Sequence, residues 1–347
     1  MKKFTFCLLL ICSGGFTFCD AQTFIDSFRM YRDVKITLDV PSYQYKETML
    51  ILFALPNGNT TAQTMGKNLT PGDDWHFDIQ HIKAQTSFLR EKLKQNIVVA
   101  YLENDYKAWP LWKQKHPDFK TEIQHIVDTL YKIIPSKKKT IHLSGHSGGG
   151  SFVFGYLTGV EKIPAFVRRI TFLDSDYGYD SSYCHKLKKW LKQNKEATLT
   201  VFAYNDSVAL LNGKPFVSAT GGTWYKSHLM LQHLQKDFSF TQTKNDSLIF
   251  YRSTNDQIAF FFKNNPDRKI FHTQQVELNG FIHSVLYRTS EEDKGYEYFG
   301  LRAYSKFIFN YGPAGLFFLT RMCFSRKSRD LLPIVFFKCN FSDQGLP

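Results

Sequence analysis

The sequence of 347 residues has few cysteines, few glycines and no long hydrophobic run, and each shortage excludes a class of protein. With 6 Cys and 21 Gly, the chain is neither a disulfide scaffold nor collagen-like. After the N-terminus no segment reaches the roughly 18 apolar residues of a membrane-spanning helix, so we expect no membrane span. What the chain has is 33 Phe and 18 Tyr, enough apolar surface for a full hydrophobic core.

Acidic residues are also in short supply. The 44 Lys and Arg exceed the 31 Asp and Glu, which gives a formal net charge of +13. Such an excess could serve a nucleic acid, an anionic surface or an acidic substrate. The basic residues are scattered, however, and their longest run is Lys137–Lys139. We therefore favour a solvated surface and expect no nucleic-acid partner.

The first 21 residues have the pattern of a signal peptide. A basic start, Met1–Lys3, precedes the apolar stretch Phe4–Phe18, and Cys19–Ala21 then offers small residues where a signal peptidase cuts. We expect cleavage near Ala21 and a secreted or periplasmic protein. The remaining cysteines are odd in number and lack metal-ligand spacing, so neither disulfides nor a metal are expected to hold the fold: Cys184, Cys323 and Cys339.

From residue 34 onward, short β-rich runs alternate with amphipathic helical stretches. The expected strands are Val34–Val40, Met49–Leu55, Ile97–Leu102, Thr140–Leu143, Ile170–Leu173, Leu199–Tyr204 and Ile270–Leu278. The expected helices are Phe77–Leu93, Phe119–Ile134, Ser151–Thr158, His185–Lys192 and Trp224–Leu234. This alternation predicts an α/β fold in which helices cover both faces of a mostly parallel sheet. No linker divides residues 22–309, which we interpret as one domain, whereas residues 310–347 lose the alternation and form an appendage of unknown role.

One motif carries chemistry. The strand Thr140–Leu143 leads into Gly145-His146-Ser147-Gly148-Gly149, and a helical run follows. Gly-x-Ser-x-Gly between a strand and a helix is the pattern of a nucleophile elbow, where the serine occupies a strained turn and its glycine neighbours pass close to adjacent backbone. A phosphate-binding loop is excluded, because Ser151 and Phe152 stand where Lys and Ser or Thr are required. The plain alternative is a glycine-rich turn without chemistry.

With this motif the chain resembles the α/β-hydrolase superfamily, in its serine-esterase branch, over about Val34–Phe309. The resemblance implies a doubly wound, mostly parallel sheet of eight strands and a Ser–acid–His triad in that chain order. The nucleophile would be Ser147. The oxyanion hole would use the backbone N–H of Gly148 and a second donor, Gly58 or Asn59, in the loop after an early strand.

Two sites compete for the acid of the triad. Asp206 follows the strand Leu199–Tyr204, the usual position in the family, whereas Asp174 and Asp176 follow the strand before it and are the alternative. The plain alternative for Asp206 is a turn or helix-cap aspartate.

The base must follow the acid, which leaves His228, His233, His272 and His283. His228 and His233 lie on a predicted helix, and His272 lies inside the predicted last strand. His283 lies on a predicted loop after that strand, so we favour it as the base.

The sequence therefore predicts a secreted serine hydrolase that cleaves carboxylic esters of carbohydrates or lipids through an acyl-enzyme on Ser147. A serine peptidase on the same fold, or a non-catalytic carbohydrate-binding protein on a hydrolase scaffold, are the alternatives. We expect no cofactor and no metal. The partner would be an ester substrate, small or polymeric, and the oligomeric state is open.

Overall fold

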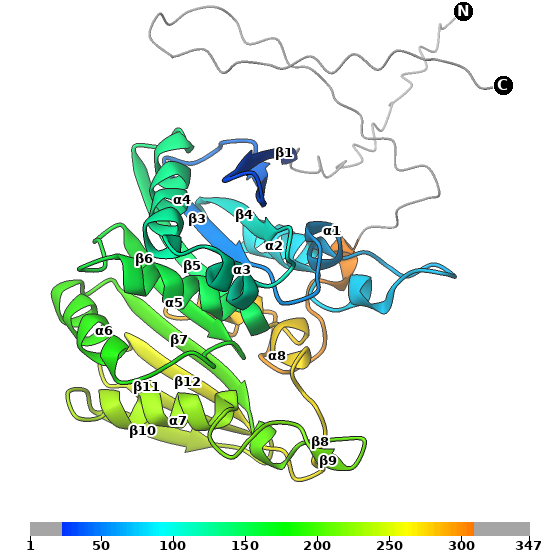
Figure 1. Ribbon diagram of the computed structural model, residues 1–347, viewed down its shortest axis with the longest axis vertical. Helices are drawn as coiled ribbons and strands as arrows, with labels where there is room; N and C mark the ends of the chain where they lie inside the picture. Colours follow the sequence, from blue (N-terminus) through cyan, green and yellow to red (C-terminus); the bar gives the residue numbers. More distant parts are fainter. Residues whose placement is uncertain (1–22, 309–347) are drawn as a thin grey trace, which may run out of the picture. The chain divides into compact units, whose positions relative to one another are not determined.

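The computed structural model describes residues 23–308, which belong to one compact unit (Figure 1). The expected signal peptide and the whole of the expected appendage, including Cys323 and Cys339, lie outside the described residues. Within 23–308, no helix combines the length and the apolar character needed to cross a membrane.

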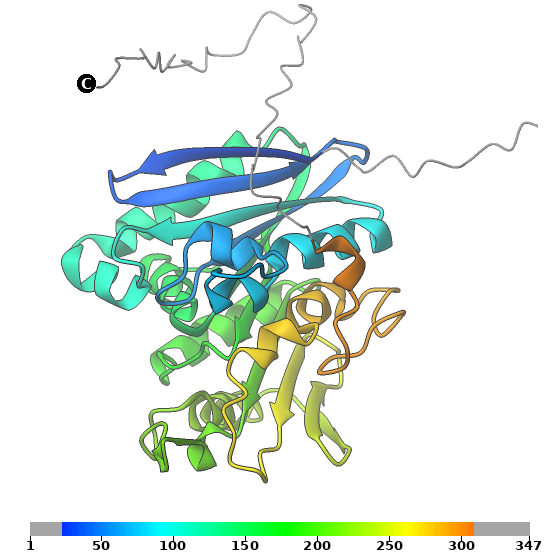
Figure 2. The same cartoon turned by 90° about the vertical axis from the view of Figure 1, so that its right-hand side faces the viewer.

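Ten strands form the main sheet, in the order β1-β2-β4-β3-β5-β6-β7-β12-β11-β10. The strands are β1 Thr23–Met30, β2 Val34–Pro41, β3 Glu47–Ala54, β4 Asn96–Asn104, β5 Lys138–His146, β6 Val167–Leu173, β7 Thr198–Tyr204, β10 Phe240–Lys244, β11 Leu248–Ser253 and β12 Ile258–Lys263. The six central strands, from β4 to β12, run parallel, and antiparallel strands flank them at both ends of the sheet (Figures 1 and 2). The predicted α/β fold with a mostly parallel sheet is confirmed, with ten strands instead of eight.

Helices cover both faces of this sheet. Core residues of α3 Trp109–Lys115, α4 Phe119–Ile133, α5 Gly150–Gly159, α6 Ser182–Gln193 and α7 Thr223–Leu234 share one hydrophobic cluster. Those of α2 Ile82–Lys92, α8 Gln274–Glu277 and α9 Gly280–Leu286 share the cluster on the other face. The remaining short elements are α1 Thr61–Met65, the strands β8 Leu210–Leu211 and β9 Lys214–Pro215, and the 3₁₀ turns η1 Trp75–Asp78, η2 Ser147–Gly149, η3 Asp206–Val208 and η4 Ser305–Phe307.

The central strands are apolar along their whole length because both of their faces are buried. In β3, Leu50, Leu52 and Ala54 join the first cluster, whereas Ile51 and Phe53 join the second. Successive side chains of a strand point to opposite faces, so a strand covered on both sides cannot alternate apolar with polar residues. This continuous pattern is what made the parallel sheet predictable.

The expected last strand, Ile270–Leu278, is wrong. The last parallel strand is β12, which pairs with β7, and residues 270–278 form a loop and the short helix α8. The reason is burial: every residue of Ile258–Lys263 is buried, and Phe260 and Phe261 supply one face each. Because its β-forming residues are buried on both faces, β12 is the segment that pairs with β7. The chain that follows β12 therefore begins at the carboxyl end of the sheet. His272 therefore lies on a loop and not inside a strand.

Candidate active site

Ser147 occupies a strained turn between β5 and α5. Its φ is +53°, in the left-handed region that residues with a Cβ seldom adopt. The strand β5 ends at His146, the 3₁₀ turn η2 begins at Ser147, and α5 follows at once. The residue is half-buried and directly follows the carboxyl end of β5. The local geometry is the predicted strand–turn–helix elbow.

The glycines around Ser147 are sterically required. A Cβ on Gly145 would lie 2.7 Å from the carbonyl carbon of Gly149, and one on Gly149 would lie 2.1 Å from the oxygen of Ala54. A Cβ on Gly150 would lie 1.8 Å from the oxygen of Ser175. All three neighbours are backbone atoms that cannot move aside. The elbow therefore packs directly against the ends of β3 and β6.

Asp174 and His272 form a carboxylate–imidazole pair next to this elbow. Asp174 is the residue after β6, fully buried, with φ +46°. Its Oδ2 contacts Nδ1 of His272, and its Oδ1 accepts a hydrogen bond from the Thr223 hydroxyl. A carboxylate on Nδ1 holds the proton there, which leaves Nε2 of the ring as the basic nitrogen. The side chain of His272 is 17% exposed, so this nitrogen can meet a substrate.

His146 connects the pair to the elbow. Its Nε2 donates to the backbone oxygen of His272 at 3.1 Å, and the centroids of the two rings lie 4.6 Å apart. Burial, and then the neighbouring His272, lower the pKa of His146 well below its usual value, so this imidazole is neutral. This hydrogen bond holds the His272 loop against the last residue of β5, which directly precedes Ser147.

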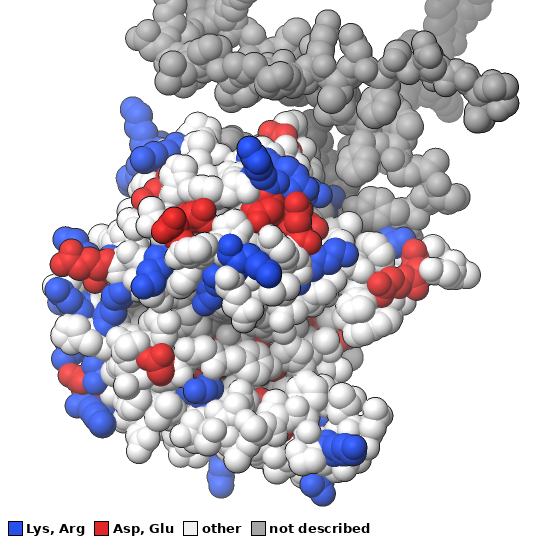
Figure 3. Space-filling model, in the orientation of Figure 1, with Lys and Arg blue, Asp and Glu red and all other residues white. Residues whose placement is uncertain are grey.

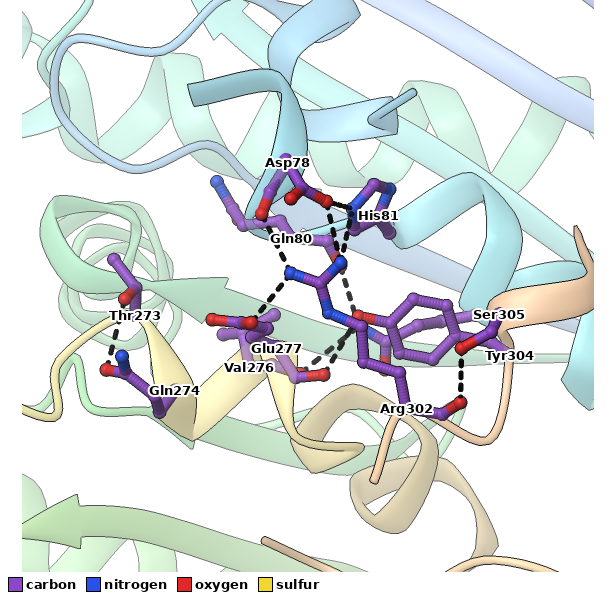
Figure 4. A network of polar contacts seen from close by, with 11 residues as sticks. Asp78, Gln80, His81, Thr273, Gln274, Val276, Glu277, Arg302, Tyr304 and Ser305 are labelled. Carbon is purple, nitrogen blue, oxygen red and sulfur yellow. Dashed lines mark hydrogen bonds and ion pairs between the residues drawn. The ribbon is translucent and has the colours of Figure 1, made fainter. Parts of the chain in front are cut away.

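A second polar network anchors the segment after His272 (Figure 4). The Arg302 guanidinium donates to Glu277 of α8 at 2.6 Å and to the Asp78 carboxylate, also at 2.6 Å. The hydroxyl of Tyr304 donates to the backbone oxygen of Glu277 at 2.8 Å. His81, which precedes α2, contacts the same Asp78 carboxylate at 2.7 Å. Helix α8 is thus tied to η1 and α2, which limits the movement of His272 two residues before it.

The structure places Asp206 in a different role from the expected one. Its carboxylate accepts the backbone N–H groups of Thr223 at 2.7 Å and Trp224 at 3.3 Å, and so caps the start of α7. A Cβ on Gly222 would lie 2.3 Å from either carboxylate oxygen, so the helix start fits closely around this side chain. Burial, and then the charge of Asp174, raise the pKa of Asp206 to about 6. Among the described residues, its carboxylate contacts no histidine.

The alternative acid Asp176 is buried as well. Its Oδ2 accepts a hydrogen bond from the Ser227 hydroxyl at 2.9 Å, and its Oδ1 has no partner among the described residues. Burial raises the pKa of Asp176 well above its usual value. Of the three predicted carboxylates, Asp174 is the one that the structure brings to a histidine.

The structure does not bring His283 to Asp206. His283 belongs to α9, not to a loop, and packs with the second cluster, with its ring centroid 4.6 Å from that of Phe261. Its Nδ1 lies 3.0 Å from the Tyr296 hydroxyl, and its Nε2 has no partner within residues 23–308. Burial, and then the charge of Arg252, lower the pKa of His283 to about 3. The expectation rested on a misplaced last strand, since β12 makes His272 the loop histidine.

The loop after β3 borders Gly148, but through a residue that the sequence analysis missed. The Asn57 side chain lies against Gly148, where an added Cβ would come within 1.8 Å of the Asn57 Oδ1. The two predicted donors are occupied: the N–H of Gly58 donates to the Lys107 oxygen at 2.8 Å, and that of Asn59 to the Pro56 oxygen at 3.4 Å. Only the tertiary approach of the two loops distinguishes Asn57 from its neighbours in the Pro56–Thr60 turn.

The described part of the chain has no group of three or more His, Cys, Asp or Glu side chains arranged to hold a metal ion. Asp174, Asp176 and Asp206 lie within one acidic region, but each is held by hydrogen bonds from Thr223, Trp224, Ser227 or His272. These carboxylates therefore serve the protein's own side chains and backbone.

Comparison with known proteins gives likenesses of fold at low identity. No family model and no curated protein matches the sequence. Among solved structures, poly(aspartic acid) hydrolase-1 from Sphingomonas sp. KT-1 is 14% identical, with 76% of this chain and 98% of that chain covered and a TM-score of 0.39. The esterase Pf2001 of Pyrococcus furiosus is 12% identical over 76% of this chain and 87% of that chain, with a TM-score of 0.38. An IroE-like serine hydrolase from Shewanella oneidensis is 12% identical over 77% and 80%, with a TM-score of 0.42.

Proposed function

We propose that this protein is a serine hydrolase that cleaves carboxylic esters, with Ser147 as nucleophile, His272 as base and Asp174 as the acid that orients the base. The observation that carries the proposal is the left-handed Ser147 at a strand-to-helix elbow, with the Asp174–His272 pair hydrogen-bonded to the adjacent His146. A glycine turn in a binding protein has no reason to gather a buried carboxylate and a partly exposed imidazole at the same edge.

The chemistry follows from these positions. His272 Nε2 takes the hydroxyl proton as the Ser147 oxygen attacks the ester carbonyl carbon, while Asp174 stabilises the imidazolium that forms. The C–O bond of the ester then breaks, and His272 returns the proton to the leaving alkoxide, which departs as the alcohol. Water, deprotonated by the same nitrogen, attacks the acyl-enzyme and releases the carboxylic acid and free Ser147.

The oxyanion of each tetrahedral intermediate would be bound at the start of η2 and α5. The backbone N–H of Gly148, in the first turn after the nucleophile, would be one donor, because the free N–H groups at the start of a helix favour negative charge. We assign the second donor to the side-chain N–H group of Asn57, because its Nδ2 also borders Gly148 and because the N–H groups of Gly58 and Asn59 are already bonded.

The decisive experiment tests Ser147 directly. The purified protein is incubated with a fluorophosphonate, the labelled peptide is identified by mass spectrometry, and hydrolysis of p-nitrophenyl esters of several acyl lengths is measured. Ser147→Ala should lose both labelling and hydrolysis, with kcat lower by roughly 10⁶-fold as in the best-studied serine hydrolases.

Ser151→Ala is the matched control, because Ser151 lies one turn further along α5. It should keep wild-type labelling and rate. Wild-type protein that neither labels nor hydrolyses any of the esters, or Ser147→Ala that retains the wild-type rate, would contradict the proposal.

A further inference from the structure

A basic cleft lies between α6 and the C-terminal end of α7, lined by none of the residues assigned to catalysis. Its volume is about 690 Å³, and its charged lining consists of Lys188, Lys189, Lys192, Lys236 and Asp237. Four lysines and one aspartate leave a formal excess of three positive charges. Figure 3 shows Lys and Arg side chains gathered along the margin of the molecule where Figure 1 labels α6.

The single acidic residue of the cleft is already neutralised. Asp237 accepts Lys188 Nζ at 2.5 Å and Lys192 Nζ at 2.6 Å, one on each carboxylate oxygen. These two hydrogen bonds lower the pKa of Asp237 to about 2. Lys189 and Lys236 are exposed and form no ion pair with any residue in the range 23–308. The cleft therefore holds two lysines that are paired with Asp237 and two exposed lysines without an ion pair.

Three lysines of α6 line the cleft from one face of the helix: Lys188, Lys189 and Lys192. Lys188 and Lys192 are one helical turn apart, roughly 6 Å at 1.5 Å per residue, and Lys236 adds a fourth lysine next to Asp237. Several lysines close together favour an anion that itself carries several charges.

The chemistry of the lining excludes two other polyanionic partners. None of the exposed large hydrophobic side chains of the described chain lines the cleft, whereas a protein face that enters a bilayer adds apolar side chains to its basic ones. The lining also lacks arginine and the Phe, Tyr and Trp rings on which nucleic-acid bases stack, and its only rings are the imidazoles of His185 and His233. Lysines act as point charges without a preferred plane, and Ser181 and Gln193 add neutral hydrogen-bonding groups.

We propose that this cleft binds a linear acidic polysaccharide, with its carboxylate or sulfate groups on the lysines of α6 and on Lys236. The polymer chain lies along α6, the neutral side chains bind its hydroxyls, and Lys189 and Lys236 supply the charges that are not shared with Asp237. His233 also lines the cleft. Burial, and then the positive charges of Lys236 and Lys188, lower the pKa of His233.

The experiment measures binding and needs no enzymatic activity. Affinity electrophoresis and calorimetry at low salt are run with polygalacturonate, dextran sulfate and neutral dextran, which separate carboxylate from sulfate and both from the sugar alone. The double variant Lys189→Glu/Lys236→Glu should weaken binding of the preferred acidic polymer by about tenfold or more, and should reduce the dependence of binding on salt.

The control is Lys94→Glu/Lys244→Glu, which changes the net charge equally at exposed lysines outside the cleft. It should stay within about twofold of the wild type. Equal weakening by both double variants would assign binding to net charge and overturn the cleft site. Failure of the wild type to bind either acidic polymer, or tighter binding to single-stranded DNA or to phosphatidylglycerol vesicles, would overturn it as well.

Discussion

Two histidines follow the last parallel strand, and their surroundings are opposite. His272 is partly exposed, with a buried carboxylate on one ring nitrogen. His283 is buried among aromatic rings, with the Tyr296 hydroxyl as partner of one nitrogen and no partner for the other within residues 23–308. The carboxylate of Asp293 lies 3.5 Å from Nδ1 of His283, and the Asp293 side chain is 66% exposed.

The difference shows what an imidazole needs in order to act as a base. Burial alone disfavours the charged form, and at His283 it lowers the pKa to about 3. The buried carboxylate of Asp174, by contrast, contacts Nδ1 of His272. In the proposed mechanism His283 therefore serves packing, and His272 serves proton transfer.

The largest expected effect is the difference in activity between variants of these two histidines. His272→Gln should lower kcat/KM for p-nitrophenyl esters by about 10⁴-fold or more, since the base is removed. His283→Gln should change it by less than about tenfold, because His283 contacts no group assigned to the reaction. Far-ultraviolet circular dichroism of both variants checks that they are folded.

The opposite ranking would break the comparison. If His283→Gln lost the activity and His272→Gln kept it, the base would lie in α9 and the Asp174–His272 pair would be structural.

The two aspartates give the next largest contrast. Asp174→Asn should lower kcat by about 10⁴-fold, because an amide cannot hold His272 in the required tautomer. Asp206→Asn keeps one oxygen for the N–H groups at the start of α7, so we expect a loss of about 1–2 kcal/mol of stability and a change in kcat below about tenfold. Urea unfolding and ester hydrolysis, measured on both variants, separate the two roles. If Asp206→Asn lost most of its kcat while keeping normal stability, the acid of the triad would be Asp206, at the end of β7, and the assignment of Asp174 would be wrong.

How far the sequence could predict this site depended on local patterns. The elbow around Ser147 is local, because strand, serine, glycines and helix are contiguous, and it was placed correctly along the chain. The continuous apolar strands from β3 to β7 were visible for the same reason.

The proposed base, His272, could not be predicted, because its position depends on a pairing between distant parts of the chain. Both Ile258–Lys263 and Ile270–Leu278 contain β-forming residues, and only pairing with β7 decides which of them is the strand. Because Ile258–Lys263 is the strand, His272 lies on a loop and not in a strand. The hydrophobic periodicity of the sequence does not reveal which of the two segments pairs with β7. Asn57 was missed similarly, because its approach to Gly148 joins two loops that are 91 residues apart in sequence.

The last effect we predict is a pH dependence of stability to which His283 contributes together with other buried histidines. The usual pKa of histidine, about 6.5, applies to the unfolded chain, whereas in the folded protein the pKa of His283 is lowered to about 3. Between these values the unfolded state binds the extra proton, so stability rises with pH and is lost as the pH falls from about 6.5 toward 3, by at most about 1.4 kcal/mol per pH unit. Urea unfolding at pH 7, 6, 5 and 4 should therefore show a shallower slope for His283→Phe than for the wild type. Some slope should remain, because burial also lowers the pKa of His142 and His146.

The exposed His185 is the control, and His185→Gln should keep the wild-type slope. If His283→Phe kept the full slope as well, the ring of His283 would already be accessible to protons, and the contrast with His272 would fail.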